Sequence, residues 1–427
     1  MLIQLFKLYK IQILRILNIG YFIPPDRKGI MLSFNTAVGS RYSAAVLTLP
    51  LVLIHSNEVL NKAGLETIRE TIDMINKLTL SICAVLIGTS SYAQAKQPEF
   101  AIHHCKAAEI NAQHYRNFPD ALLEAQKRQE SIAAVKQARQ DNRYKSADGS
   151  SYVDMLAISD SPTYVIPVVF HVYGTVHNGD TVNDAVILDA LHKTNEDFQG
   201  QTADFADIDP EFDGVKDSLN VEFRLASIDP DGNPTSGIIY HPQSSGAGNY
   251  SSSDVKNDHW DNYKYMNVYI QNDLYADGVT NNSGVAWYPD SGMSDEGLAR
   301  VTYNGAYLGT NTDENFRSVL THEFGHFLDL IHTFEGGCKR GAVKRCGKTG
   351  DKSCDTPQQN SWQMNPGDGG ILNCLGETIN WQNFMAYSDQ YANYTQDQVD
   401  RMVNGLNSSA RQTLWSASNL AATGTAD

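Results

Sequence analysis

The chain has 427 residues, of which 41% are hydrophobic and 19% charged, so it can form a globular domain with additional segments. The formal net charge of -16 argues against nucleic acid and anionic membranes as partners, because both attract clustered lysine and arginine. Four of the six cysteines lie between positions 338 and 374, a pattern typical of a disulfide-bonded loop in an exported protein.

Residues 74–95 have the layout of a secretory signal peptide. An apolar run from Leu78 to Ile87 follows a short basic region, and Ala93-Gln-Ala95 matches the small-residue cleavage signal. Because signal peptides act at the N-terminus, we expect translation to start at Met74 and residues 1–73 to be an over-extended reading frame. The alternative is that these residues are genuine and that the apolar run is a buried helix. The run is short for a membrane span, so we expect a product without a membrane partner, secreted or periplasmic in a bacterium.

Residues 96–155 are polar and helix-prone, and they end in a turn-rich, basic segment from Arg139 to Ser151 that a protease can reach. This is typical of a propeptide, which leaves residues 156–427 as the main domain. Cys105 stays unpaired if the four downstream cysteines pair and Cys83 leaves with the signal peptide. A lone thiolate in such a segment can bind a metal ion at an active site and block it, so Cys105 is a candidate latency residue if the main domain holds a metal. A free or intermolecular cysteine is the alternative.

From Tyr164 onward the pattern is that of a globular α/β domain. Branched and aromatic residues predict a buried strand over Tyr164–Tyr173, and apolar spacing predicts a helix over Val182–Phe198 with Asn183 as its N-cap. A capping box at Asn311–Glu314 is expected to open a later helix. Further strands are predicted at Leu219–Ile228, Tyr265–Gln271, Val285–Pro289 and Leu298–Tyr303. The third of these ends at proline and suits an edge strand that holds an extended peptide over a cleft.

The stretch from His322 to His332 carries the strongest chemical signal. His322 and His326 are four residues apart, so on a helix both imidazoles can reach one metal ion. Glu323 can take a proton from an attacking water and pass it to a leaving amine. His332 completes the three ligands of a catalytic zinc site only if the helix ends near Asp329 and the chain turns back.

The segment after His332 contains the four clustered cysteines, Cys338, Cys346, Cys354 and Cys374. We expect two disulfides, and the pairing of 338 with 374 and 346 with 354 is one of three that the sequence leaves open. A structural zinc site is the alternative, although the spacing lacks C-x-x-C pairs. Oxygen atoms of Asp351, Asp355 and Glu335 can coordinate calcium, but turn-forming and capping roles fit these residues equally well.

Asn383-Phe-Met-Ala-Tyr-Ser388 follows this loop region, and a helix is predicted over Thr395–Leu414, followed by a polar tail. Met385 in a tight turn can form an apolar floor beneath the zinc ligands. The hydroxyl of Tyr387 can reach the metal or a developing oxyanion. The hexapeptide becomes a strong signal only because it follows the histidine motif.

Together these stretches resemble the pappalysin family of metzincin metallopeptidases, most closely its secreted bacterial members of the cytophagalysin type. The resemblance runs from about Tyr164 to the C-terminus and rests on Ile166-Pro-Val-Val-Phe-His171, the histidine motif with His332-Thr-Phe334, Asp355-Thr-Pro357 and Asn383-Phe-Met-Ala-Tyr-Ser-Asp389. It implies an α/β (α+β) fold with a twisted, mostly parallel sheet, an edge strand above the cleft, an active-site helix, and an irregular C-terminal subdomain with a Met-turn. Bound calcium is common in the family.

The resemblance also implies roles for single residues. By position, it makes His322, His326 and His332 zinc ligands, Glu323 the general base and acid, Met385 the Met-turn residue and Tyr387 a transition-state stabiliser. The chain departs from the family pattern at Ala386, where aspartate is usual, and at Asp329, where glycine is usual. Glycine enters the left-handed conformation freely, whereas aspartate tolerates it at a cost of about 1 kcal/mol.

The sequence therefore predicts a secreted zinc endopeptidase that is made as a latent precursor and acts on proteins or peptides. One alternative is a catalytically silent binding protein, which would follow if Asp329 kept His332 away from the metal. Another is a zinc amidase that acts on cell-wall peptide. The sequence predicts neither the cleavage preference nor the oligomeric state.

Overall fold

The computed structural model describes residues 20–22, 29–38, 41–50, 105–145 and 164–427, the last range without 315, 340, 342, 362–365, 367–369 and 389. The chain divides into two compact units, Met1–Gln97 and Pro98–Asp427. The first contains an antiparallel sheet of three strands, β1 (Gly20–Phe22), β2 (Gly29–Val38) and β3 (Arg41–Pro50). The predicted signal peptide at 74–95, with Cys83, lies outside the described residues.

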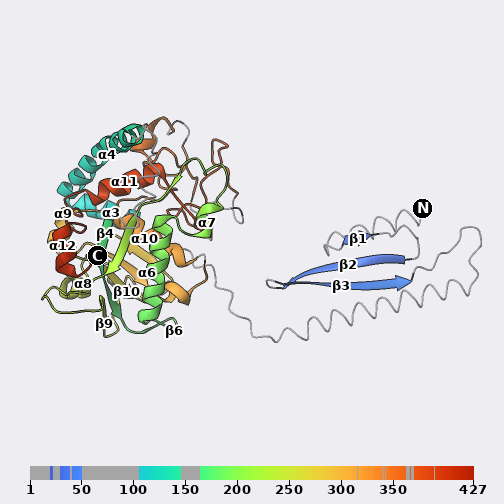
Figure 1. Cartoon of the computed structure of the whole chain (residues 1–427), viewed down its shortest axis with the longest axis horizontal. Coiled ribbons are helices and arrows are strands. Elements are labelled where there is room, and N and C mark those ends of the chain that lie inside the picture. Colours follow the sequence, from blue (N-terminus) through green and yellow to red (C-terminus); the bar gives the residue numbers. More distant parts are fainter. Residues whose placement is uncertain are drawn as a thin grey trace, which may run out of the picture. The chain divides into compact units, whose positions relative to one another are not determined.

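The second unit is built around a six-stranded sheet (Figure 1). Its strands are β4 (Tyr164–Tyr173), β8 (Val221–Leu225), β9 (Ile238–His241), β10 (Met266–Gln271), β11 (Gly284–Ala286) and β12 (Arg300–Asn304). The order is β11-β12-β10-β4-β8, and β9 also pairs with β4. Every pair is parallel except β11 with β12. The mostly parallel sheet is thus confirmed, and β11 is the predicted edge strand, although it ends earlier than predicted.

Two helices cover one face of this sheet, α6 (Asp184–Gln199) and α10 (Val319–Phe327). The side chain of Asn183 accepts a hydrogen bond from the amide of Val186, which confirms the predicted N-cap. Alternate residues of β4, such as Phe170, point into the core that these helices share, because strand side chains alternate between faces. The opposite face carries a smaller core under two short helices, α8 (Ser253–Asp258) and α9 (Ser291–Asp295).

The predicted propeptide forms two helices, α3 (Ala107–Asn117) and α4 (Pro119–Lys145). Helix α4 lies alongside α11 (Gln396–Leu406) near the end of the chain (Figure 1). The remaining elements are short: β5 (Val176–His177), β6 (Asp180–Thr181), α7 (Ala203–Ala206), β7 (Lys216–Asp217), β13 (Tyr394–Thr395), α12 (Ala417–Thr423), and the 3-10 helices η1 (Gly305–Tyr307), η2 (Gly309–Asn311), η3 (Phe316–Ser318) and η4 (Val343–Lys348). None of the helices in the described ranges has the length and apolarity that a bilayer span requires.

Two predictions about helix ends are wrong. The expected capping box at Asn311–Glu314 does not begin α10, the helix that carries His322 and His326 and is called the histidine helix below. The side chain of Asp313 accepts from the amide of Phe316 and so caps η3, and α10 begins only at Val319. The helix predicted over Thr395–Leu414 ends at Leu406, and the expected polar tail forms α12. In both places local turns interrupt a helical spacing of apolar residues.

The irregular region between α10 and β13 contains two disulfides. Cys338 is bonded to Cys374, and Cys346 to Cys354, so one of the three open pairings is the one observed. Cys105 is free and buried, as the cysteine count predicted. The four clustered cysteines therefore form disulfide bonds within this region and do not form a second metal site.

Candidate active site

Three imidazoles converge at the end of α10. His322 and His326 are completely buried on this helix, which ends at Phe327. Asp329 then has a φ of +84°, the left-handed conformation expected for it, and the chain turns back. As a result, Nε2 of His326 lies 3.1 Å from Nε2 of His322 and 3.0 Å from Nε2 of His332. The predicted fold-back after one helix is confirmed.

Backbone carbonyls set the orientation of two of these rings. Nδ1 of His322 lies 2.6 Å from the carbonyl oxygen of Phe384, and Nδ1 of His326 lies 2.7 Å from that of Leu330. Because a carbonyl only accepts, each Nδ1 carries the proton and each Nε2 presents a lone pair to the other imidazoles. Burial lowers the pKa of His322 to about 4 and that of His326 well below its usual value, so both rings stay neutral.

This arrangement fits a metal ion. Lone pairs that face one another at this distance repel unless a cation lies between them. Ligand nitrogens of tetrahedral zinc are about 3.3 Å apart when each bond is about 2.05 Å, close to the observed separations. The ligand atoms of His322, His326, His332 and Cys105 all lie within 4.8 Å of one another. The donor set is that of a zinc site with three histidines and one further position.

Met385 lies directly beneath the histidine helix and is completely buried. A Cβ added to Gly325 would meet the Met385 sulfur at 2.6 Å, so the helix approaches the Met-turn this closely only because residue 325 is glycine. The turn is held by a hydrogen bond from the Met385 amide to the side chain of Asn383. The turn also supplies the Phe384 carbonyl that orients His322, so the position of Met385 and the orientation of the His322 ring depend on each other.

Glu323 points from α10 toward the edge strand and is completely buried. A Cβ on Gly284 of β11 would meet the Glu323 Cγ and Oε1 at 2.6 Å, so only glycine leaves room for this carboxylate under the edge strand. Burial raises the pKa of Glu323 to about 8. Gly284 could not be recognised from the sequence, because a single glycine at the start of a strand does not indicate which side chain packs on it.

The predicted propeptide enters this site. The Cys105 sulfur lies 3.5 Å from Oε2 of Glu323, and the Tyr387 hydroxyl donates to the Cys105 carbonyl at 3.1 Å. Burial, and then the charge of Glu323, raise the pKa of the Cys105 thiol well above its usual value. The cysteine predicted to act in latency is therefore adjacent to Glu323, the three imidazoles and Tyr387 at once.

Asn111 of α3 contacts the free side of the edge strand. Its carboxamide donates to the carbonyl of Ala286 at 3.2 Å and accepts from the amide of Tyr288 at 3.1 Å. A peptide group of a bound extended chain would use the same two backbone groups. Nothing in the sequence around Asn111 indicates this role, since the contact depends on where α3 docks.

The residues considered for calcium make other contacts. Asp355 accepts from the Thr395 hydroxyl and the Asp397 amide, which caps the start of α11. Asp351 accepts from the Thr356 hydroxyl and the Ser353 amide. These contacts support the capping and turn roles that the sequence left open. Among the described residues, Glu335, Asp351 and Asp355 are not in a group close enough to hold a metal, and calcium binding stays a prediction.

Comparisons with known proteins agree with this geometry. Residues 249–407 match the model of a peptidase family, M43, described by pregnancy-associated plasma protein-A. An extracellular metalloprotease of Verticillium alfalfae is 31% identical over 157 residues, 33% of this chain and 48% of that protein. One of Colletotrichum graminicola is 25% identical over 270 residues, 59% of this chain and 80% of that protein. The chain thus spans about half the length of the first of these relatives.

Two solved structures extend the comparison. Mirolysin in complex with compound 9 is 25% identical, with a TM-score of 0.52 over 62% of this chain and 99% of that chain. A mutant of Tannerella forsythia promirolysin, at 23% identity and a TM-score of 0.51, covers 72% of this chain and 95% of its own and shares the fold. With three converging histidines and the turn at Met385, the chain is similar to the pappalysin (M43) family of metzincin metallopeptidases.

Proposed function

We propose that this chain is the precursor of a secreted zinc endopeptidase, with residues 156–427 as the catalytic domain and 96–155 as a propeptide. One observation carries the proposal: three imidazoles bring their Nε2 atoms together beside a buried glutamate, and backbone carbonyls fix the Nδ1 protons of two of them, His322 and His326. The curated relatives are extracellular metalloproteases, which supports export. Residues 74–95 then act as the signal peptide, residues 1–73 have no part in the function, and a bacterial origin stays a prediction.

His322, His326 and His332 would hold the ion. A zinc ion bound there would polarise the scissile carbonyl and make water acidic enough to lose a proton near neutral pH. Glu323 is placed to accept that proton, and its raised pKa suits a group that must hold the proton and then deliver it to the leaving amine. The hydroxyl of Tyr387, once free of the Cys105 carbonyl, would donate to the developing oxyanion.

Cys105 would keep the precursor latent. Its sulfur shares a group of possible ligand atoms with the three histidines, so it can take the further position at a zinc ion. A cation there reverses the preference for the protonated thiol that burial alone creates. The same residue contacts Glu323 and Tyr387. Removal of the propeptide would therefore release the metal position, the base and the oxyanion donor together.

Two other functions were left open by the sequence. A silent binding protein would need His332 displaced by the turn at Asp329, but His332 faces His326. A zinc amidase acting on cell-wall peptide would use the same catalytic groups, so only the substrate separates it from an endopeptidase. The contact of Asn111 with the edge strand favours a site for extended peptides, and digestion of unfolded proteins against purified cell wall distinguishes the two.

The test is Glu323→Gln in the full chain, followed by removal of the propeptide with an added protease. The variant should keep one zinc ion per chain, because the imidazoles are unchanged, and should cleave peptides at least about 100-fold more slowly. Glu211→Gln, at an exposed glutamate, is the matched control and should behave like the wild type. Cleavage by Glu323→Gln at the wild-type rate, or a purified chain without zinc, would contradict the proposal.

A further inference from the structure

Asp329, the residue at the usual glycine position of the histidine motif, lies between two arginines. Its carboxylate is buried, with Oδ1 3.1 Å from Nη2 of Arg128 and Oδ2 2.8 Å from Nη2 of Arg401. Arg401 also donates through Nε to the Asp329 carbonyl. Arg401 belongs to α11 of the catalytic domain, whereas Arg128 belongs to α4 of the propeptide. The Asp329 carboxylate thus pairs with one arginine from the propeptide and one from the catalytic domain.

The contact with Arg128 is the centre of a wider junction between α4 and α11. The side-chain amide of Asn404 donates to the Arg128 carbonyl at 2.7 Å, and the Ser131 hydroxyl donates to Asn404 Oδ1 at 2.7 Å. Arg401 donates through Nη1 to the side chain of Gln129. These bonds join one turn of α4, residues 128–131, to α11, so the ion pair of Arg128 is part of a set of hydrogen bonds between the two helices.

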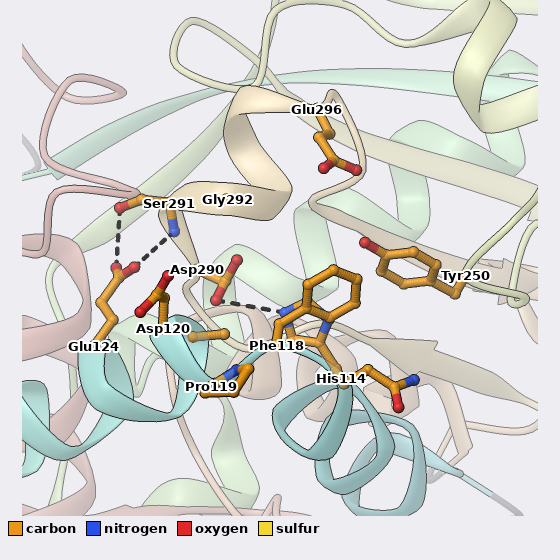
Figure 2. A pocket seen from close by; sticks show the side chains of 12 residues that line it. His114, Phe118, Pro119, Asp120, Glu124, Tyr250, Asp290, Ser291, Gly292 and Glu296 are labelled. Carbon is orange, nitrogen blue, oxygen red and sulfur yellow. Dashed lines mark hydrogen bonds and ion pairs between the residues drawn. The ribbon is translucent and has the colours of Figure 1, made fainter.

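Helix α4 has a second contact nearer its start. Glu124 accepts from the amide and the hydroxyl of Ser291, both at 3.0 Å, and both residues line a cavity of about 400 Å³ (Figure 2). Figure 2 also shows Asp290 facing His114 of α3, at 3.5 Å. These contacts involve partly exposed groups or a longer ion pair, whereas the Arg128 side chain is only 5% exposed. Lys136 of α4 also pairs with Asp397 of α11 at 2.6 Å, but the lysine side chain is 30% exposed. The pair of Arg128 with Asp329 is therefore the more deeply buried ion pair between α4 and the catalytic domain.

The two arginines are not equivalent. If Arg128 leaves with the propeptide, Asp329 still faces Arg401, so the catalytic domain keeps its buried carboxylate paired. Arg128 alone depends on the junction, since among the described residues only Asp329 lies within hydrogen-bond distance of the guanidinium, and Glu124 is 3.7 Å away. Arg128 can therefore bind to Asp329 or leave it without leaving an unpaired charge in the catalytic domain.

We propose that Asp329 and Asn404, backed by Arg401, form an arginine-binding site on the catalytic domain, outside the metal centre, and that Arg128 is its occupant in the precursor. The inference rests on the proposed function in treating α3 and α4 as a removable propeptide. The ligand class is a guanidinium on a helical segment, which a lysine ammonium matches poorly because it cannot present the same planar fork. The site anchors α4 independently of the Cys105 thiol, so the precursor has two separate anchors.

The test measures hydrogen exchange in the full chain carrying Glu323→Gln, which prevents self-processing. The readout is the exchange rate of α4 amides over residues 119–137 relative to that of α6. Arg128→Gln should raise this ratio about 30-fold or more, the effect expected for truncating one partner of a buried charge pair. Arg128→Lys should fall in between. Lys127→Gln removes the exposed neighbouring charge and should leave the ratio unchanged, as should Cys105→Ser.

The outcomes separate the inference from the proposed function. A ratio for Arg128→Gln equal to that for Lys127→Gln would overturn the arginine site, as would Cys105→Ser releasing α4 as fully as Arg128→Gln. If Arg128→Gln only lowers the overall stability, amide exchange becomes faster in both α4 and α6 and their ratio does not change. That result also counts against the arginine site. Asp329→Asn should raise the ratio without any change in α4 itself. Because no catalytic readout is involved, failure of the zinc endopeptidase proposal would leave the exchange result intact.

Discussion

The substitution Gly325→Ala tests whether the Met-turn controls the histidine helix. In an exposed helix this change stabilises by about 1 kcal/mol, because alanine has the higher helix propensity. Here the new Cβ would lie 2.6 Å from the Met385 sulfur and 3.2 Å from the Tyr394 hydroxyl, whereas favourable contacts of this kind lie near 3.5 to 4.0 Å. Met385 must move by about 1 Å, and overpacking of this kind costs about 1 to 3 kcal/mol.

We therefore expect Gly325→Ala to lower the free energy of unfolding by about 1 to 2 kcal/mol, measured by urea denaturation of the zinc-free chain. The zinc affinity should fall as well, because a displaced Met-turn carries the Phe384 carbonyl away from His322. Met385→Ala in the same chain is the control: it opens space for the new methyl, so the two changes together should cost less than their sum. A variant that is as stable as the wild type and binds zinc equally well would refute the coupling.

Three further changes have defined outcomes. Gly284→Ala should displace Glu323 and lower kcat of the processed enzyme about 100-fold with zinc retained, as checked by peptide hydrolysis and metal analysis. Replacing both Cys338 and Cys374 by serine opens a 36-residue loop and should cost about 4 kcal/mol in urea unfolding. His171 is neutral in the folded state because burial lowers its pKa to about 4, so protonation of the unfolded chain should remove about 2 to 3 kcal/mol of stability between pH 7 and pH 4.5; His171→Gln should lack this loss.

The parts of the site that could be predicted from the sequence are those set by residues close together in the chain. The four-residue spacing of His322 and His326 places both imidazoles on one side of a helix in any context. The third ligand could be predicted because a straight helix would have carried His332 away, which left the turn at Asp329 as the only solution. The strand Tyr164–Tyr173 was predicted to the residue, since a run dominated by branched and aromatic residues has few other structures.

What the sequence could not reveal depends on contacts between distant segments. Gly325 and Gly284 are required by what packs on them, Met385 and Glu323, and neither partner is near in sequence. The helix start at Val319 was missed because Asp313 caps a 3-10 turn first, and a capping pattern does not state which helix type follows. Asp329 was recognised as an unusual residue in a turn, but its two arginine partners lie 201 residues before and 72 residues after it.

The two hydrogen bonds between Asn111 and the edge strand have a consequence for the processed protein. While α3 is in place, the outward carbonyl of Ala286 and amide of Tyr288 are satisfied. If the proposed propeptide is removed, this sheet border becomes a template for any extended chain, including a loosened segment of a neighbouring molecule. Catalytic competence and a tendency to self-associate therefore arise in the same step, and a concentrated, processed sample without substrate should be the least stable form in storage.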